Sequence, residues 1–356
     1  MKNILYLTSM PSPFQDDFLD ACVKELGNNY AIKVYYTRES NPERAHWGES
    51  RYGEPIFHFK KNEYYKFLSN SNPSIIVFTQ FTGKIFEWGR KWCDKNNIPY
   101  FIGPAEIMAL SKRSFLKNIL IKRYLKSVLK SARGIMVMGN SAVRYIQEIY
   151  SGPVANIPYS FDLSRLLSFP QLPLKNNPIT FLYSGRLVEF RNPLKCIRMF
   201  GELVRMYPDK KLKFIISGTG PLMDACLQEI EKQNIKEKVE WIIDFKDWYD
   251  IHNLYKKAHI LLSLQHYSTW GLITQEAMAA GMTTISSYTI FSADQLIVDN
   301  YNGFLVPTSE EIILKKMQYY VEHPESINLH GKRSREMVKT IDCTQSAKNF
   351  CDMILA

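Results

Sequence analysis

Short runs of apolar residues alternate along the chain with longer segments in which apolar residues recur at helical spacing. In the first half these runs predict strands over residues 4–7, 31–36, 75–78, 100–102 and 134–137. Helical segments fill the gaps between them. Strands that alternate with helices form parallel sheets covered by helices, so the pattern predicts an α/β fold.

The rhythm is interrupted once and then begins again. Residues 157–178 contain four prolines and the polar stretch 175–177, which is typical of a linker. Predicted strands follow over 179–183, 212–216, 239–243, 260–263, 283–285 and 303–306, with helices over 193–207 and 221–233. We therefore expect two Rossmann-like, doubly wound domains, over 1–160 and 161–335. A helix in 336–356 is expected to cross back to the first domain.

Length and composition agree with two ordered domains. The chain has 356 residues, beyond the roughly 250–300 at which a single core stops growing. Apolar residues make up 46% and charged residues 22%. The first apolar run is too short for a signal peptide, and no run of about 18 apolar residues predicts a transmembrane helix. These features predict a cytoplasmic protein.

Cysteine, histidine and acidic residues show no metal-binding spacing. The six cysteines lack a Cys-x-x-Cys pair, the histidines form no H-E-x-x-H group, and the chain contains no Asp-x-Asp. We expect buried, reduced thiols, no metal site and no cofactor.

The net charge of +10 is concentrated in one segment. Residues 107–147 contain nine Lys or Arg and no Asp or Glu. Placed on a helix, this segment gives a basic face with two apolar residues within it, and we expect that face to contain Lys112, Phe115, Ile119, Lys122, Arg123, Lys126, Lys130 and Arg133. The opposite side is expected to hold Leu116, Leu120, Tyr124, Val128 and Leu129.

A basic face of this kind has more than one interpretation. Apolar residues among cations are used by helices that bind anionic membranes, which makes peripheral attachment to the inner face of the cell membrane the favoured hypothesis. A solvated face is the alternative. Nucleic acid is disfavoured, because no nucleic-acid-binding motif accompanies the charge.

Three predicted strand-to-helix turns carry residues suited to a phosphate ligand. Residues 184–193 include Gly185, Arg186 and Arg191, and two cations beside a helix N-terminus can clamp phosphate groups. Residues 217–221 hold Gly218 and Gly220 before a proline that suits a helix start. Each turn taken alone is equally consistent with an ordinary surface turn.

The third turn is the most informative. After the strand 260–263 comes Trp270-Gly271, followed by a helix predicted over residues 274–281. The amides of Gly271, Leu272 and Ile273 would then face whatever lies above the sheet. Glu276 can accept hydrogen bonds from a ribose diol. An acidic residue near a helix start also complements the helix dipole, so both interpretations stand.

Together these motifs resemble the retaining glycosyltransferases of family 4, which have the GT-B architecture of two Rossmann-like domains facing a cleft. Order and spacing match over roughly residues 179–307. The resemblance implies that Arg186 and Arg191 hold the diphosphate of a nucleotide-sugar donor and that Glu276 binds its ribose. It also implies that Asp244 and Phe245 contact the base. Ser268 stands where the family has a glutamate that contacts the donor sugar.

The remaining predicted contacts follow from this resemblance. Donor contacts are expected from Gly185, Gly218, Gly220, Trp270, Gly271, Leu272 and Ile273. Acceptor-side candidates are Asp16, Asp17 and Glu106, although Asp16 and Asp17 equally suit the first turn of a helix. The expected activity is metal-independent, retaining transfer of a sugar to a lipid-linked or polysaccharide acceptor in cell-envelope glycan synthesis. Two alternatives are a non-catalytic binding subunit and an epimerase or phosphorylase of the same fold.

Overall fold

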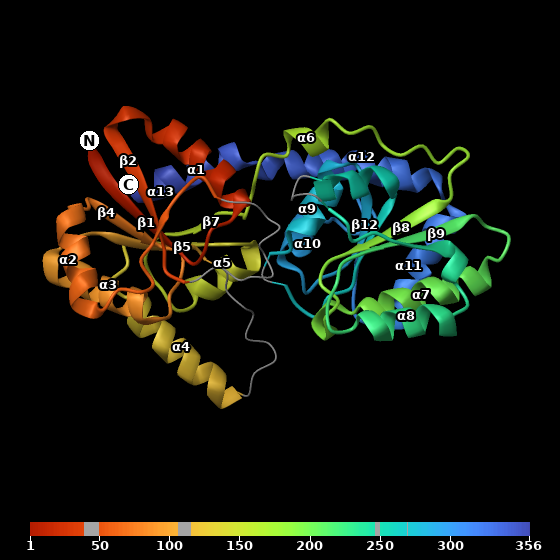
Figure 1. The fold of residues 1–356 in the computed structure, drawn as a ribbon, viewed down its shortest axis with the longest axis horizontal. Coiled ribbons are helices and arrows are strands. Elements are labelled where there is room, and N and C mark those ends of the chain that lie inside the picture. The colour runs from red at the N-terminus through yellow and green to blue at the C-terminus, as the bar shows by residue number, and fades with distance from the viewer. Residues whose placement is uncertain (39–49, 106–114, 246–249, 269) are drawn as a thin grey trace. The chain divides into compact units, whose positions relative to one another are not determined.

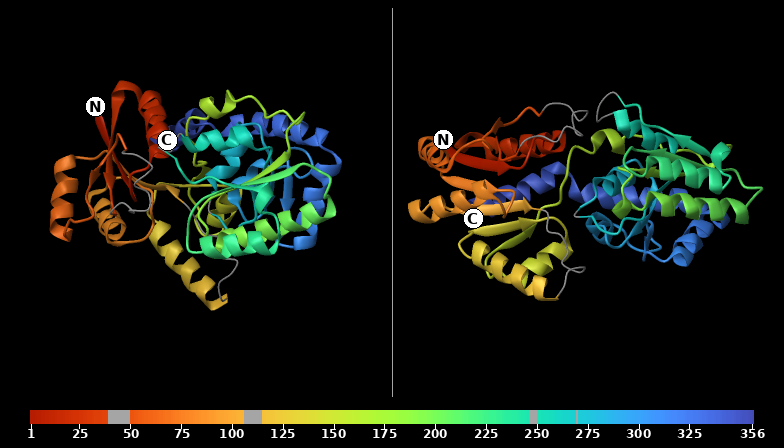
Figure 2. Two further views of the ribbon diagram at one scale, coloured as in Figure 1. Left: turned by 45° about the vertical axis from the view of Figure 1, so that its right-hand side comes forward. Right: turned by 60° about the horizontal axis from the view of Figure 1, so that its bottom comes forward.

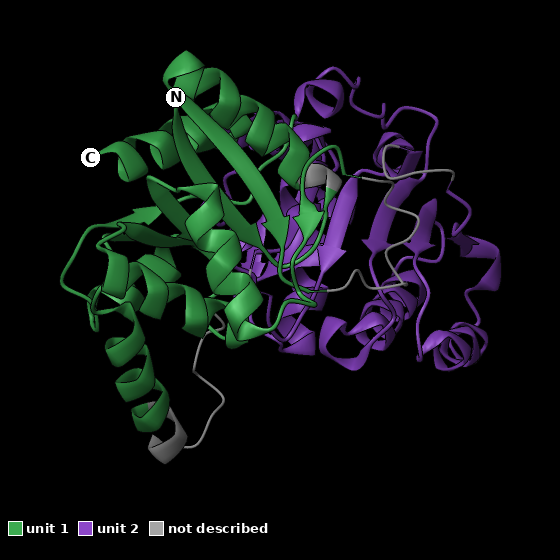
Figure 3. Cartoon of the chain, turned by 60° about the vertical axis from the view of Figure 1, so that its left-hand side comes forward, with its two compact units in different colours: residues 1–162, 341–356 green, residues 163–340 purple. Residues whose placement is uncertain are grey.

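The chain divides into two compact units (Figure 3). In the computed structural model, residues 1–38, 50–105, 115–245, 250–268 and 270–356 are described. Unit 1 contains Met1–Asp162 and Ile341–Ala356, and unit 2 contains Leu163–Thr340. No helix in the described part of the chain is both long enough and apolar enough to cross a membrane.

Unit 1 is built on a parallel sheet of seven strands in the order β3-β2-β1-β4-β5-β6-β7. The strands are β1 (Lys2–Thr8), β2 (Tyr30–Tyr36), β3 (Glu54–Pro55), β4 (Ile75–Phe78), β5 (Tyr100–Ala105), β6 (Gly134–Val137) and β7 (Val154–Asn156). The helices are α1 (Pro13–Leu26), α2 (Lys61–Ser71), α3 (Lys84–Asn96), α4 (Phe115–Leu129), α5 (Asn140–Gln147) and α13 (Cys343–Leu355). Helices cover both faces of the sheet (Figure 1).

The last helix of the chain belongs to unit 1, which confirms that it crosses back to the N-terminal domain. Helix α13 packs against α1, and its Phe350 is fully buried. The Phe350 ring lies edge-on to Phe18, with 5.4 Å between ring centroids, and to Tyr6 at 6.0 Å. Asp342 begins the helix by accepting a hydrogen bond from the amide of Gln345 at 2.8 Å. The C-terminal segment therefore completes the core of unit 1.

The basic helix differs from its sequence-based prediction. Helix α4 ends at Leu129, so Lys130 and Arg133 lie beyond it. Leu120 and Tyr124, predicted on the side opposite the basic face, are 64% and 42% exposed. Figures 1 and 2 show that α4 extends away from the sheet, and its buried residues Leu125, Val128 and Leu129 lie in its C-terminal turns.

The basic residues predicted on this face differ from one another in pairing and exposure. Lys122 forms an ion pair with Glu148 at 2.7 Å and lies over the ring of Tyr145. Arg123 and Lys126 are exposed, and Ile119 is 38% exposed. Lys112 and the side chain of Phe115 lie outside the described residues.

Unit 2 has a parallel sheet of six strands in the order β10-β9-β8-β11-β12-β13. The strands are β8 (Ile179–Ser184), β9 (Leu212–Ser217), β10 (Val239–Trp241), β11 (Ile260–Ser263), β12 (Thr283–Ser287) and β13 (Phe304–Val306). The helices are α6 (Ser164–Leu167), α7 (Pro193–Met206), α8 (Met223–Lys232), α9 (Leu272–Ala279), α10 (Phe291–Leu296), α11 (Glu310–Glu322) and α12 (Glu325–Val338). Strands β8 and β11 are central, and their buried apolar runs explain the pattern in the sequence.

The two parallel sheets with helices confirm the predicted doubly wound α/β fold. Each sheet reverses its strand order once. In unit 1 the chain builds β2 and β3 on one side of β1 and then places β4 on the other. In unit 2 it builds β9 and β10 on one side of β8 and then places β11 on the other. Ligands of open α/β sheets bind outside the carboxyl ends of the strands at such a reversal.

Candidate functional site

The loops that follow β8, β9 and β11 leave the sheet of unit 2 at one edge, because all three strands run parallel. The reversal of strand order lies between β8 and β11. The three turns singled out in the sequence are therefore brought to the place where a ligand is expected.

Glycines allow the loops after β8 and β9 to lie against each other. The Gly185 amide donates to the Ser217 carbonyl at 2.9 Å, and the Leu187 amide donates to the Thr219 carbonyl at 2.9 Å. A Cβ on Gly218, which has a φ of +141°, would lie 2.0 Å from the Gly185 carbonyl oxygen. Glycine is required at Gly218 for this close approach.

Gly185 also makes room for Arg191. A Cβ at Gly185 would lie 2.4 Å from Nη1 of Arg191. The guanidinium therefore lies directly beside the backbone of the β8 loop. It also lies near the ring of Phe190, with 5.8 Å between Cζ and the ring centroid, and Phe190 stacks on Tyr267. Arg191 is thus held in place by its surroundings.

Arg191 lacks a counter-charge within the described part of the chain. Its Nε is buried without a hydrogen-bond partner there, and no described carboxylate forms an ion pair with it. Burial lowers the pKa of Arg191, and the nearby charge of Arg186 lowers it further, although Tyr183 opposes this. Two cations close together, one of them desolvated, favour an anion as the missing partner.

The β8 loop is tied to the β11 loop by two hydrogen bonds. Asn192 donates its side-chain amide to the Leu264 carbonyl at 2.6 Å. The His266 amide donates to the Phe190 carbonyl at 2.7 Å. These bonds fix the position of Arg191 relative to the segment that leads into α9.

Helix α9 begins at Leu272, two residues earlier than the sequence pattern predicted. Gly271 precedes it with a φ of +88°, which makes the sharp turn, and a Cβ there would lie 2.8 Å from Ile290 Cγ2. The amides of Leu272 and Ile273 consequently belong to the first helical turn, where they have no partner within the helix. The N-terminus of α9 is suited to binding an anion.

Two neighbours of this turn hold it in place. Trp270, predicted as a donor contact, is 1% exposed and donates its indole N–H to Gln275 Oε1 at 2.9 Å. We assign Trp270 a positioning role, because its ring is in the interior. The Ser268 amide donates to the Thr289 carbonyl at 3.1 Å, and the Ser268 side chain is partly exposed. Ser268 is therefore available at the edge of the sheet.

Glu276 is buried and has an unused acceptor atom. It is 3% exposed, and the Tyr255 hydroxyl donates to its Oε2. Its Oε1 has no hydrogen-bond partner among the described residues. Burial raises the pKa of Glu276 to about 7, although the Tyr255 hydrogen bond opposes this shift. A buried carboxylate oxygen without a partner fits the hydroxyl donors of a ribose.

Tyr255 was not found by sequence reasoning. It lies in a short 3₁₀ helix (Asp250–Lys257) and is 21 residues before Glu276 in the chain. Nothing in its immediate sequence marks it as a partner of a carboxylate. Only the packing of this segment under α9 brings the two side chains together.

The segment predicted to contact a base follows β10. Asp244 is exposed and Phe245 is partly exposed. The indole of Trp241 donates to the Gly218 carbonyl at 3.3 Å, which connects this strand to the β9 loop. Asp244 and Phe245 are thus on the same edge as the glycine turns. Among the described residues, no cluster of three or more His, Cys, Asp or Glu side chains is placed to hold a metal ion.

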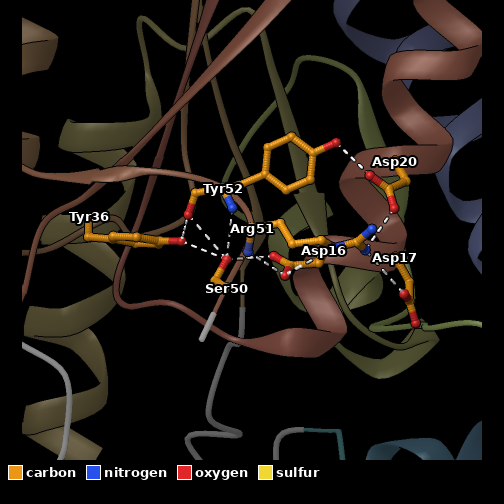
Figure 4. A network of polar contacts seen from close by, with 7 residues as sticks. All are labelled: Asp16, Asp17, Asp20, Tyr36, Ser50, Arg51 and Tyr52. Atoms are coloured by element: carbon orange, nitrogen blue, oxygen red, sulfur yellow. Dashed lines mark hydrogen bonds and ion pairs between the residues drawn. The ribbon is translucent and has the colours of Figure 1, made fainter. Parts of the chain in front are cut away.

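The acceptor-side candidates Asp16 and Asp17 hold a neighbouring loop (Figure 4). Asp16 is 3% exposed, and it accepts hydrogen bonds from Ser50 Oγ at 2.6 Å and the Arg51 amide at 2.8 Å. The Arg51 guanidinium lies 3.7 Å from both Asp16 and Asp17 and 2.7 Å from Asp20. These contacts assign Asp16 and Asp17 a structural role in unit 1. Glu106 lies outside the described residues.

Asp17 has a second internal contact. Its Oδ2 accepts a hydrogen bond from the Asp162 amide at 3.1 Å. Burial raises the pKa of Asp17, while the Asp162 amide and Arg51 lower it. Asp17 therefore connects α1 to the end of the first segment of unit 1.

We expect Ser50→Ala to destabilise unit 1 by about 1–2 kcal/mol, because the buried Asp16 carboxylate would lose a hydrogen bond. Chemical denaturation followed by circular dichroism measures this loss. Ser69→Ala is the matched control, since Ser69 is exposed and its hydroxyl donates to the Tyr65 carbonyl within α2. Equal stability of the two variants would contradict the structural role of Asp16.

Comparison with known proteins finds a family model that matches the second half of the chain. Residues 164–337 match the family model described as Glycosyl transferases group 1. This match covers the whole candidate site, from Gly185 to Glu276. It agrees with the family resemblance drawn from the motifs.

Three proteins illustrate the similarity. A Bacillus subtilis poly(glycerol-phosphate) alpha-glucosyltransferase is 24% identical over 156 residues, which is 44% of this chain and 22% of that protein. A Campylobacter jejuni α-1,4-N-acetyl-D-galactosaminyltransferase, named for a diNAcBac-PP-undecaprenol acceptor, is 28% identical over 229 residues, or 63% and 60% of the two chains. An Anabaena protein solved in complex with UDP has a TM-score of 0.75 at 12% identity, covering 99% of each chain, and shows the same fold. This chain spans less than two thirds of the length of either curated relative.

Proposed function

We propose that this chain, which residues 164–337 place among the group 1 glycosyl transferases with a GT-B fold, transfers a sugar from a nucleoside-diphosphate donor to a lipid-linked or polysaccharide acceptor. The process served would be cell-envelope glycan synthesis. The observation that carries the proposal is Arg191, a partly buried cation beside Arg186 with no described counter-charge.

Each part of the site has a proposed role in donor binding. Arg186 and Arg191 bind the diphosphate, and the first amides of α9 add to the positive potential there. Glu276 accepts hydrogen bonds from the ribose through its free Oε1. Gly218 and Gly220 keep the backbone close to the nucleotide. Asp244 and Phe245 contact the base.

The proposed reaction retains the configuration of the sugar and uses no metal. The bond between the anomeric carbon and the diphosphate oxygen breaks, and the acceptor oxygen bonds to that carbon on the same face. The acceptor proton passes to the departing diphosphate, whose negative charge Arg186 and Arg191 stabilise. Ser268 contributes one neutral hydrogen bond near the sugar, where a carboxylate would contribute charge.

The names of the relatives support the acceptor class. One is named for poly(glycerol-phosphate) and the other for an undecaprenol diphosphate. Both names describe acceptors of the kind assembled into cell-envelope glycans.

Incubation with a panel of UDP-, GDP-, ADP- and dTDP-sugars tests the proposal. With polyprenyl-diphosphate saccharides or glycerol-phosphate oligomers as acceptors, and EDTA present, we expect a mass increase of one sugar and release of a nucleoside diphosphate. NMR of the product should show the donor's anomeric configuration. Donor epimerisation without transfer, or binding without turnover by any donor, would favour the alternative functions.

The exposed part of α4 supports peripheral binding to an anionic membrane. We expect the double substitution Arg123→Glu and Lys126→Glu to reduce sedimentation with phosphatidylglycerol vesicles at least fivefold, because surface cations contribute about 1 kcal/mol each. A matched control replaces Lys232 and Lys236 of unit 2 by glutamate. Equal sedimentation of both variants would reject α4 as the membrane contact.

A further inference from the structure

A cavity of about 480 Å³ lies at the carboxyl edge of the sheet of unit 1. The residues that line it include Leu7 of β1, Phe78 of β4, and Thr37 and Arg38 just after β2. Strand order reverses between β1 and β4, so the cavity occupies the position in unit 1 where an open α/β sheet binds a ligand. It is separate from the candidate donor site, which lies wholly in unit 2.

The charge of the cavity wall has one sign. Its basic residues are Arg38, Lys60, Lys61 and Lys84, and no Asp or Glu is among the described residues that line it. None of these four cations forms an ion pair with a carboxylate in the part of the chain that the structure describes. The Glu63 carboxylate accepts a hydrogen bond from the Lys60 amide at 2.6 Å but is not part of the described lining, so the described wall carries four cations, which favour an anionic ligand.

Two helices begin at this wall. Helix α2 starts at Lys61 and α3 starts at Lys84, and both residues line the cavity. Gly83, which precedes α3, has no atom within 4 Å of the position of a Cβ, so there is free space beside that helix start. The free amides of a helix N-terminus attract a phosphate group, which adds to the effect of the four side chains.

The rest of the wall is aromatic and polar. Phe57, Phe59 and Trp88 line the cavity, and Phe57 is 40% exposed. Thr37, Gln80 and Thr82 add hydrogen-bonding groups. Aromatic faces combined with hydroxyl and amide groups suit the ring or chain of a sugar or polyol. The ligand class is thus an anion attached to a polyhydroxylated group.

We propose that this cavity binds the phosphoryl group of the acceptor together with its adjoining saccharide or polyol. This inference rests on the proposed transfer function and names the acceptor class: a substrate that carries phosphate, either on a soluble oligomer or in a lipid-linked diphosphate. Arg38, Lys60 and Lys84 bind the phosphoryl oxygens. The aromatic wall holds the group attached to them.

Binding measurements on the full chain test this assignment. The probes are a glycerol-phosphate oligomer and a polyprenyl-diphosphate saccharide in detergent, each with its dephosphorylated counterpart. We expect the wild-type chain to bind at least one phosphorylated probe at least tenfold more tightly than its counterpart. Whichever phosphorylated probe binds better identifies the source of the phosphate. Failure of both probes to bind, or equal affinity with and without phosphate, would overturn the proposal.

Substitutions then localise the binding. The double variant Lys60→Gln and Lys84→Gln should weaken binding of the phosphorylated probe at least tenfold. Lys95→Gln is the matched control, because Lys95 is on α3, exposed, and outside the cavity wall. Wild-type affinity in the double variant would overturn the proposal.

Nucleoside diphosphate binding by the same variants separates this proposal from the donor-site proposal. The double variant should bind nucleoside diphosphate as the wild type does, which also shows that it is folded. Loss of acceptor binding with donor binding intact supports the cavity. Failure of the wild-type chain to bind any nucleoside diphosphate would instead count against the proposed function.

Discussion

Replacing Arg191 with methionine is expected to weaken nucleoside diphosphate binding by at least about 100-fold without destabilising the protein. Charge-assisted hydrogen bonds to phosphate are worth about 1.5–3 kcal/mol each, and a guanidinium makes two. In the unliganded chain the Arg191 side chain is desolvated and has no described carboxylate partner to offset that cost. The unfolding midpoint should therefore stay the same or rise.

Titration calorimetry and thermal unfolding of the same variant measure both effects. Arg198→Met is the matched control: Arg198 is on α7, is 38% exposed at its side chain, and pairs with Glu310 at 3.5 Å. Its loss should leave nucleotide binding unchanged. If Arg191→Met bound nucleoside diphosphate within threefold of wild type, the diphosphate would have to be held elsewhere.

The free energy of unfolding of unit 2 is expected to fall by about 3 kcal/mol between pH 5 and pH 8. Burial raises the pKa of Glu276 to about 7, above the ordinary value of 4.5. Between these values the folded state holds a proton that the unfolded state has released. Stability is therefore greatest below pH 4.5 and is lost as pH rises through 7, at roughly 1.4 kcal/mol per pKa unit.

Denaturant unfolding of wild type and Glu276→Gln at both pH values measures this change. Glutamine keeps the shape of the protonated carboxyl and cannot ionise, so the variant should lose most of the pH dependence. Glu322→Gln is the matched control, since Glu322 also accepts a hydrogen bond from a tyrosine, Tyr207, but is exposed. An unchanged pH dependence in Glu276→Gln would show that this carboxylate is already ionised at neutral pH.

The same carboxylate gives nucleotide binding an opposite dependence on pH. Ribose hydroxyls donate more strongly to an ionised carboxylate than to a protonated one. Affinity for nucleoside diphosphate should therefore rise as pH increases through 7. The Glu276→Gln variant should bind weakly at every pH.

The sequence predicted the sheets well because central parallel strands are buried on both faces. The strands at 75–78, 134–137 and 260–263 agree with β4, β6 and β11 to the residue. Strands β3 and β7 were missed, since they are two and three residues long and show no apolar run. The turns at Gly185, Gly218 and Gly271 were recognisable because a glycine between a predicted strand and a predicted helix indicates a tight turn.

Contacts between distant segments were beyond the reach of sequence patterns. Asp16 and Ser50 form a hydrogen bond although they are 34 residues apart in the chain. From the sequence alone, Asp16 is therefore indistinguishable from an acid that favours a helix start. Tyr255 meets Glu276 in the same way. Only the packing of α4 against unit 1 determines which of its turns are buried, and helical spacing alone does not predict that packing. The cavity of unit 1 is likewise lined by residues from several strand ends.

A crystal structure of the chain with a bound nucleoside diphosphate tests the account most directly. The account predicts that the diphosphate lies within hydrogen-bonding distance of the Arg186 and Arg191 guanidinium groups, with the ribose hydroxyls on Glu276 Oε1. A nucleotide bound away from the carboxyl ends of β8 and β11, or an Arg191 that still lacks an anionic partner in that complex, would contradict it.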